Sequence, residues 1–238
     1  MEQSLLSVLT LAFGLGIKHA IEPDHVIAVS TVASQTKRLR NASLSGVFWG
    51  IGHTATLFGV GMVFIRLKNE IPEKWAMSLE FLVGIMLVYL GITSLLSYNK
   101  KKIHVHVHEH GGVAHKHFHS HEQVGSHDHP HHGVSYLKSM IIGLIHGLAG
   151  SAALVLWTMS EVKSVWEGAV YILVFGAGTV IGMLLSTTMI GIPFVLSAKK
   201  TDINHVLSRI IGGVSTAFGI YYMYNLGVTE GLFNLWAL

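Results

Sequence analysis

The chain has 238 residues, of which 50% are hydrophobic and only 12% are charged, and it contains no cysteine. A soluble domain carries about 25% charged residues, so this composition, with a mean hydropathy of +0.52, predicts an integral membrane protein. The lack of cysteine excludes disulfides, thiolate metal sites and a membrane thiol oxidoreductase. The net charge of +3 gives no sign of a nucleic-acid partner, and none is expected.

Six apolar segments are long enough to cross a bilayer, which takes roughly 20 residues in a helix. In chain order they are 4–32, 43–65, 77–97, 136–160, 166–196 and 206–226. The first lacks the basic start and small-residue cleavage site of a signal peptide. The pattern predicts an all-α integral membrane fold of about six transmembrane helices.

The first helix carries His19, Glu22, Asp24 and His25 around Pro23. Ionisable side chains at membrane depth are costly unless they face a cavity or a ligand. Pro23 has no backbone N–H and suits the first turn of a new helix, so helix 1 is predicted to break there. On an unbroken helix His19 and Asp24 would point about 140° apart, so the break also allows them to converge on one ion.

The second helix offers a further ligand, His53, which follows a pair of glycines at 50 and 52 in a small and apolar run. Glycines allow helices to approach closely, so His53 is expected to reach the first helix. Imidazoles with a carboxylate and no thiolate suit Ni²⁺, Co²⁺, Zn²⁺ or Cu²⁺ better than Mg²⁺ or Ca²⁺. The predicted metal ligands are His19, Asp24, His25 and His53.

Four other ionisable residues near these helices receive weaker predictions. Glu22 and His146 are candidates for secondary ligands, although a histidine in an apolar helix is as often a hydrogen-bonded packing residue. Glu80 is predicted to be a charge at the membrane interface. Lys18, beside His19, is expected to point away from the ion.

Residues 99–134 differ in composition from the rest of the chain, because they hold 12 of its 17 histidines and few apolar residues. This composition predicts a flexible loop without a packed core. Neutral imidazole binds metal and histidine has a pKa of about 6.5, so the loop is expected to capture metal weakly at neutral pH and to release it in acid. The loop histidines are His104, His106, His108, His110, His115, His117, His119, His121, His127, His129, His131 and His132.

Alternate loops carry most of the basic residues, at 37–40, 100–102 and 199–200. Excess Lys and Arg mark the cytoplasmic side of a membrane. Both termini are therefore predicted outside and the His-rich loop in the cytoplasm.

The two halves of the chain share an internal repeat. The pentapeptide at 16–20, Gly-Ile-Lys-His-Ala, is echoed at 143–147 by Gly-Leu-Ile-His-Gly, and glycine pairs recur in helices 2 and 5 and in helices 3 and 6. With three helices each, the halves must lie in opposite orientations, as in many secondary transporters. The predicted organisation is an N-terminal three-helix repeat with the metal site (1–98), the His-rich loop (99–134) and a C-terminal three-helix repeat (135–238).

Two motifs resemble those of the nickel/cobalt transporter family. Residues 18–26, Lys-His-Ala-Ile-Glu-Pro-Asp-His-Val, resemble its helix-1 signature His-x4-Asp-His, and residues 48–56 resemble its second signature, an aromatic pair followed by Gly-His-Ser/Thr. The sequence of the first motif is most similar to that of the UreH-type urease-accessory branch of this family. The resemblance implies transport of Ni²⁺ or Co²⁺, with His19, Asp24, His25 and His53 needed for metal binding.

The second half departs from the larger family members, because residues 146–154 and 182–187 contain no carboxylate. The coupling to an energy source is therefore open. No nucleotide-binding Gly-rich Lys-Ser/Thr motif is present, so a secondary transporter or permease without a cofactor is expected, rather than an enzyme.

The favoured function is nickel uptake for urease or hydrogenase maturation, with cytoplasmic nickel chaperones as implied partners. The alternatives are a nickel/cobalt efflux protein, a metal buffer acting through the loop, and a membrane-embedded metalloenzyme that activates water.

Overall fold

The computed structural model describes residues 5–36, 38–67, 72–96, 105–110, 113–118, 135–161, 164–198 and 201–237. For 105–110, 113–118, 151–161 and 201–202 it describes the backbone only. The elements are α1 (Leu5–His19), α2 (Pro23–Ala33), α3 (Leu39–Leu67), α4 (Glu73–Leu96), β1 (Val105–His110), β2 (Val113–Phe118), α5 (Tyr136–Glu161), α6 (Val165–Ser197), α7 (Thr201–Tyr224), the π-helical turn η1 (Asn225–Thr229) and α8 (Leu232–Ala237).

Every apolar segment predicted from the sequence forms a helix. By length and composition, four helices can cross a membrane: α3, α4, α6, and α7 taken together with η1. The bent pair α1–α2 is a fifth candidate. α5 occupies the remaining predicted segment, but its described apolar part, Tyr136–Gly150, is shorter than a full span. The membrane part of the fold is therefore all-helical and multi-pass, as predicted, with the sixth span still a prediction.

The side chains are distributed as in a protein surrounded by lipid. Large apolar residues face outward, with Leu6 75%, Trp166 76% and Leu196 74% exposed, whereas His53 and Ser215 are fully buried. In water such a surface would favour aggregation, but in a bilayer the apolar groups contact lipid and the polar groups must find partners inside. The bundle is therefore built for a membrane.

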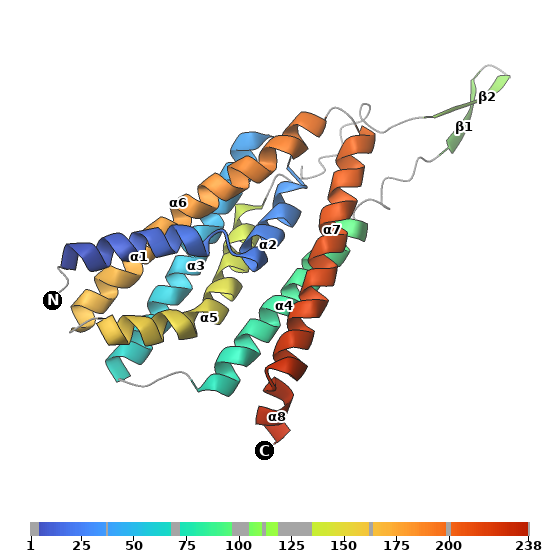
Figure 1. Ribbon diagram of the computed structural model, residues 1–238. Coiled ribbons are helices and arrows are strands. Elements are labelled where there is room, and N and C mark those ends of the chain that lie inside the picture. The colour runs from blue at the N-terminus through green and yellow to red at the C-terminus, as the bar shows by residue number, and fades with distance from the viewer. Residues whose placement is uncertain are drawn as a thin grey trace.

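The helices form two groups that α2 connects (Figure 1). α3 packs against α5 and α6, and α1 packs against α6, whereas α4 and α7 form a second pair that α4 also joins to α5. α2 contacts α3 and α6 in the first group and α4 and α7 in the second. The short helix after the break in helix 1 therefore lies at the centre of the molecule.

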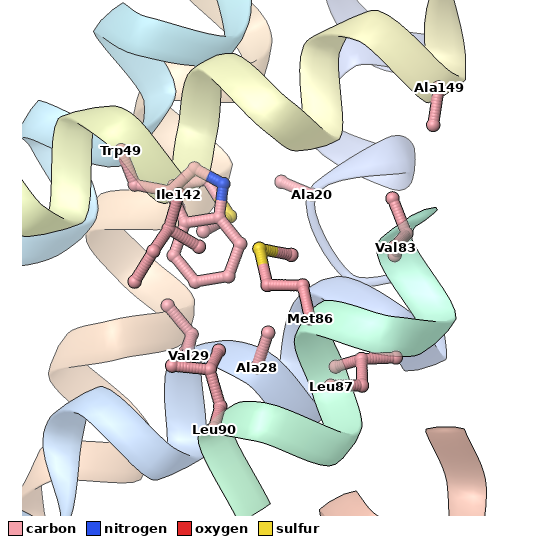
Figure 2. Packing of buried hydrophobic residues seen from close by; sticks show 11 residues of the cluster. Ala20, Ala28, Val29, Trp49, Val83, Met86, Leu87, Leu90, Ile142 and Ala149 are labelled. Carbon is pink, nitrogen blue, oxygen red and sulfur yellow. The ribbon is translucent and has the colours of Figure 1, made fainter. Parts of the chain in front are cut away.

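A buried cluster ties the two groups together, as Figure 2 shows. Trp49 of α3 and Ile142 of α5 pack with Ala28 of α2 and with Met86 and Leu87 of α4. Small residues on α2 leave room for the indole ring, which is fully buried. Close packing of this kind fixes where α2 begins relative to α3 and α5.

Glycines mark the closest approach of α4 and α7. A Cβ on Gly84 would meet the carbonyl of Gly219, and a Cβ on Gly91 would meet the carbonyl of Gly212. Gly84 and Gly91 have the same seven-residue spacing as Gly212 and Gly219, so the sequence repeat pairs Gly84 with Gly212 and Gly91 with Gly219. If each residue is replaced by its counterpart in the other half, the contact of Gly84 with Gly219 becomes the contact of Gly212 with Gly91.

The same exchange relates two further contacts. A Cβ on Gly16 in α1 would strike the carbonyl of Phe175 in α6, and a Cβ on Gly143 in α5 would strike the carbonyl of Trp49 in α3. Gly16 and Gly143 are counterparts in the repeat, as are Trp49 and Phe175. These pairings are what an inverted repeat requires, and the repeat itself remains a prediction.

The His-rich segment, predicted to be a loop, contains an antiparallel hairpin where the structure describes it. β1 and β2 pair with His106 opposite His117 and His108 opposite His115, and they stand apart from the helices (Figure 1). Alternating Val and His at 105–108 has the two-residue period of a strand, which explains the difference. The other seven loop histidines lie outside the described residues.

Candidate metal centre

The candidate site forms at the break between α1 and α2, as predicted at Pro23. The two helices meet at an angle of 55°. Glu22 has an extended backbone, with φ −64° and ψ 149°, because a proline disfavours the helical conformation of the residue before it. α1 therefore ends at His19, and α2 begins with Asp24 and His25 in its first turn.

One group of candidate ligands joins His19, His25 and His53. The Nε2 atoms of His19 and His53 lie 3.1 Å apart, and the His25 ring lies 4.5 Å from the His19 ring and 5.2 Å from the His53 ring, measured between centroids. With metal–nitrogen bonds of about 2.1 Å, two nitrogens at a right angle are about 3.0 Å apart. The nitrogens are therefore spaced for one ion.

A second group joins Asp24, His25 and His146. Asp24 Oδ2 lies 3.1 Å from His25 Nδ1 and 3.7 Å from His146 Nε2. The carbonyl of Ile142 accepts a hydrogen bond from His146 Nδ1 at 3.4 Å, which leaves the Nε2 lone pair free for a metal. His146, a secondary candidate in the sequence, thus lies beside Asp24.

The structure arranges the predicted ligands as two overlapping groups rather than as one group of four. Within each group the ligand atoms lie within 4.8 Å of one another, and His25 belongs to both. Asp24 is grouped with His146, and His53 is grouped with His19. The sequence could not indicate this division, because it depends on which side of α2 faces α3 and which faces α5.

Glu22, the other secondary candidate, belongs to neither group but contacts the candidate ligand His19. Its Oε2 lies 2.8 Å from His19 Nδ1, and its side chain is 46% exposed. A carboxylate on one ring nitrogen fixes the tautomer of a histidine and makes the other nitrogen a better ligand. Glu22 therefore orients His19 Nε2 toward His53.

Several ring nitrogens of the site have no hydrogen-bond partner among the described residues. They are both nitrogens of His25, Nδ1 of His53 and Nε2 of His146. Two of them have a carboxylate nearby, since His25 Nδ1 lies 3.1 Å and His146 Nε2 3.7 Å from Asp24 Oδ2. Buried polar atoms without hydrogen-bond partners are costly and uncommon. These nitrogens are therefore candidates to bind a metal ion.

The site opens into a cavity of about 500 Å³ between the two groups of helices. His19, Asp24, His25 and His146 line it, whereas His53 lies behind them, fully buried. The remaining lining residues are Leu15, Lys18, Glu22, Pro23, Glu80, Val83, Ala149, Gly150, Phe175, Phe218 and Tyr222. Lys18 is exposed and also lines the cavity, and the expectation that its ammonium group points away from the ion stays a prediction.

Sequence reasoning missed Glu80 and Tyr222, which line the cavity, and Trp49, which packs against His146. Glu80, predicted to be an interfacial charge, lines the cavity and accepts a hydrogen bond from the Tyr222 hydroxyl. Trp49 forms part of the wall behind the ligands, with its ring 4.9 Å from that of His146. A carboxylate inside a candidate span was the one available signal for Glu80.

Comparisons with known proteins place the chain in a family. Residues 25–221 match the family described as cytochrome C biogenesis protein transmembrane region. The chain is 60% identical, over 98% of its length and 97% of the relative, to the urease accessory protein UreH of a Bacillus species (strain TB-90). It is 28% identical, over 93% of its length and 94% of the relative, to a Methanocaldococcus jannaschii protein whose name proposes a nickel/cobalt efflux system.

A more distant relative is a chloroplast protein of Arabidopsis thaliana named for growth and fertility, at 26% identity over 75% of this chain and 45% of that protein. No solved structure matches the chain. The identity to UreH, together with the described helices, confirms the resemblance that the two motifs indicate. The chain therefore belongs to the cytochrome C biogenesis transmembrane-region family and, within it, to the UreH group of urease accessory proteins.

Proposed function

We propose that this multi-pass membrane protein transports a divalent transition-metal ion, with Ni²⁺ as the favoured substrate and Co²⁺ as the second. The proposal depends on one observation above all: two largely buried groups of candidate ligands share His25 inside a bundle with an apolar exterior. Four imidazoles and one carboxylate, without a thiolate, suit Ni²⁺ and Co²⁺. The roles of these ligands are part of the proposal.

The cavity gives the ion access to both groups. Asp24, His25 and His146 of one group line it, as do His19 and His25 of the other, whereas His53 lies behind them. The ion passes between the two groups inside the bundle. Because His25 belongs to both groups, the ion keeps a protein ligand throughout the step, which avoids the cost of a bare charge inside the membrane.

The direction we propose is uptake, with the metal supplied to urease maturation. Support comes from the high identity to a urease accessory protein, compared with the lower identity to a protein named for efflux. Cytoplasmic nickel chaperones are the proposed recipients of the ion. No cofactor and no nucleic acid takes part in this function.

The proposed orientation places both termini outside the cell and the histidine hairpin in the cytoplasm. In Figure 1 both termini lie at one end of the bundle and the hairpin lies at the other. α4 ends and α7 begins at the hairpin end (Figure 1). In the sequence, basic segments follow α4 and precede α7, so this orientation agrees with the positive-inside rule.

A metalloenzyme is the rival from another class, since a metal held by His and Asp can activate water. The ligand sharing described above favours transport, because a catalytic metal needs one fixed site with an open position. We therefore propose that the protein is not an enzyme. Transport and hydrolysis are distinguished by whether nickel crosses the membrane.

The test is nickel accumulation in metal-starved cells that express the wild-type chain or the His19→Ala/Asp24→Ala variant. Radiolabelled nickel should rise in wild-type cells and stay at background in the variant, although both proteins reach the membrane. The single variants Asp24→Ala, His25→Ala and His53→Ala should each reduce uptake at least about 100-fold, since even residues that only orient metal ligands are worth about 10- to 100-fold.

Three results would change the proposal. Less nickel in wild-type cells than in the variant would reverse the direction to efflux. Full uptake by a well-expressed Asp24→Ala variant would overturn the assignment of the site. No difference for Ni²⁺ or Co²⁺ would favour the enzyme.

A further inference from the structure

A second partly buried carboxylate lines the cavity, on the helix pair α4 and α7. Glu80 of α4 lines the same cavity as Asp24 and His146, and it is only partly exposed. It belongs to neither ligand group. A carboxylate in a membrane span is costly unless it serves a ligand or a cavity, so its position requires an explanation.

Aromatic residues of α7 hold this carboxylate in place. The Tyr222 hydroxyl donates to Glu80 Oε2 at 3.2 Å, and the Tyr222 ring stacks on Phe218 at 6.0 Å with an angle of 11° between the ring planes. One such bond uses one of about four acceptor positions on a carboxylate. Glu80 is therefore oriented and still able to bind a cation.

The charges around the cavity favour a cation. Its lining contains three carboxylates, those of Glu22, Asp24 and Glu80, and one ammonium group, that of Lys18. A cleft lined by one sign of charge between low-dielectric walls raises the local concentration of the opposite ion about 10- to 1,000-fold. Glu80 supplies one of these negative charges and belongs to neither ligand group.

Glu80 also lies toward the end of the bundle that carries both termini. It belongs to the first half of α4, which begins at Glu73, and Tyr222 lies near the end of α7 at Tyr224. Both helix ends lie at the bundle end opposite the hairpin (Figure 1). In the proposed orientation this end faces the outside, from which the ion is taken up.

We infer that Glu80, held by Tyr222, is a cation-binding carboxylate that receives the divalent ion in the cavity before it reaches Asp24 and the histidines. This inference rests on the proposed transport function. Glu80 then helps the ion to enter the cavity and is not one of the ligands that bind it tightly. Loss of Glu80 should therefore change the nickel concentration that transport needs, and leave the buried ligand groups intact.

The experiment uses the purified full-length protein and Ni²⁺ alone. Initial rates of nickel uptake into proteoliposomes give KM and Vmax, and calorimetry in detergent gives the number and affinity of tightly bound ions. The variants are Glu80→Gln, Glu80→Asp and Tyr222→Phe. Glu73→Gln is the matched control, because Glu73 is an exposed carboxylate on the same helix.

Glu80→Gln should raise KM about tenfold or more, with Vmax and tight binding close to wild type. Glu80→Asp should restore most of the affinity, and Glu73→Gln should change nothing. An unchanged KM in Glu80→Gln, or a loss of Vmax alone, would overturn the role of Glu80. If Glu80→Gln does not fold, Tyr222→Phe decides: a raised KM supports the inference and an unchanged KM overturns it.

These outcomes are distinct from failure of the proposed function. If the wild-type protein neither binds nor transports Ni²⁺, the proposed function itself is wrong. If it does both and Glu80→Gln is indistinguishable from it, only the inference about Glu80 is wrong.

Discussion

Helix 1 and its counterpart in the second half, α5, have related sequences but different shapes. His19 of α1 corresponds in the repeat to His146 of α5, three residues after matching glycines. Beyond the histidine, the first half continues with Glu22-Pro23-Asp24 and breaks by 55°, whereas the second half continues with Ala-Gly-Ser and α5 runs on to Glu161. A proline and two carboxylates thus separate a broken helix from a continuous one.

The difference shows why the candidate metal ligands are concentrated in the first half. The break brings His19 and His25, six residues apart, close together, whereas α5 runs on without a break and carries one histidine, His146. α5 accordingly contributes His146 alone to the described ligand groups. The second half supplies one candidate ligand on a continuous helix, and the first half supplies candidate ligands on both sides of a break.

The largest effect is expected when the first half is made to resemble the second. Pro23→Ala removes the restriction on Glu22 and allows α1 and α2 to join, because a proline inside a helix costs about 3 kcal/mol relative to alanine. His19 and His25 would then separate, and nickel transport should fall about 10- to 100-fold, as for other losses of ligand orientation. Uptake assays on membranes with equal protein content give the size of the effect.

The shape change in Pro23→Ala can be measured separately. The chain has no cysteine, so spin labels on cysteines introduced at Leu6 and Gln35, both exposed, report the distance across the bend. This distance should increase in Pro23→Ala. Reduced transport at an unchanged distance would show that the proline acts in some other way.

An effect of intermediate size on the stability of the fold is expected when one of two glycines on α5 is replaced by alanine. A Cβ at Gly143 would strike the carbonyl of Trp49, whereas a Cβ at Gly150 would have the His19 ring at 3.6 Å as its nearest contact. Gly143→Ala should therefore destabilise the fold by about 1–3 kcal/mol through overpacking. Gly150→Ala should be neutral or slightly stabilising, because alanine favours a helix by up to about 1 kcal/mol.

Thermal unfolding of both variants in the same detergent tests this contrast. The two substitutions are chemically identical and lie on one helix, so each is the control for the other. Equal melting temperatures would mean that α3 and α5 do not approach as closely as the structure shows.

The smallest effect is expected from the segment that joins the halves. Deletion of residues 101–132 should lower nickel uptake only a few-fold, because the buried ligands remain; complete loss would favour a metal buffer instead. A peptide of residues 99–133 should bind several Ni²⁺ weakly near neutral pH. This binding should disappear by about pH 5, since imidazoles with a pKa of about 6.5 become protonated as the pH falls.

Calorimetry of that peptide at pH 7.5 and pH 5 tests the prediction for the loop. A peptide with every histidine replaced by asparagine should bind no nickel at either pH. Equal binding at the two pH values would rule out imidazole as the ligand.

Much of the fold follows from the sequence, for definite reasons. Apolar runs at least as long as the bilayer specify helices wherever they occur, and Pro23 specifies a break because of its own covalent geometry. The hairpin was not predicted, because the alternation of Val and His at 105–108 lies in a segment whose polar, His-rich composition is typical of a loop. The location of Glu80 was missed because a single charge near a helix end has the same pattern at an interface and at a cavity.

The sequence by itself determined the membrane setting, the order of the helices, the break at Pro23 and the residue types available to a metal. Each of these depends on local chemistry: hydropathy, backbone restriction, or the donor atoms of a side chain. The tertiary structure alone decided that Asp24 lies beside His146, that His25 belongs to both ligand groups, and that Glu80 shares their cavity. These relations depend on the packing of α2 between two groups of helices, and packing across such distances leaves no periodic pattern in the chain.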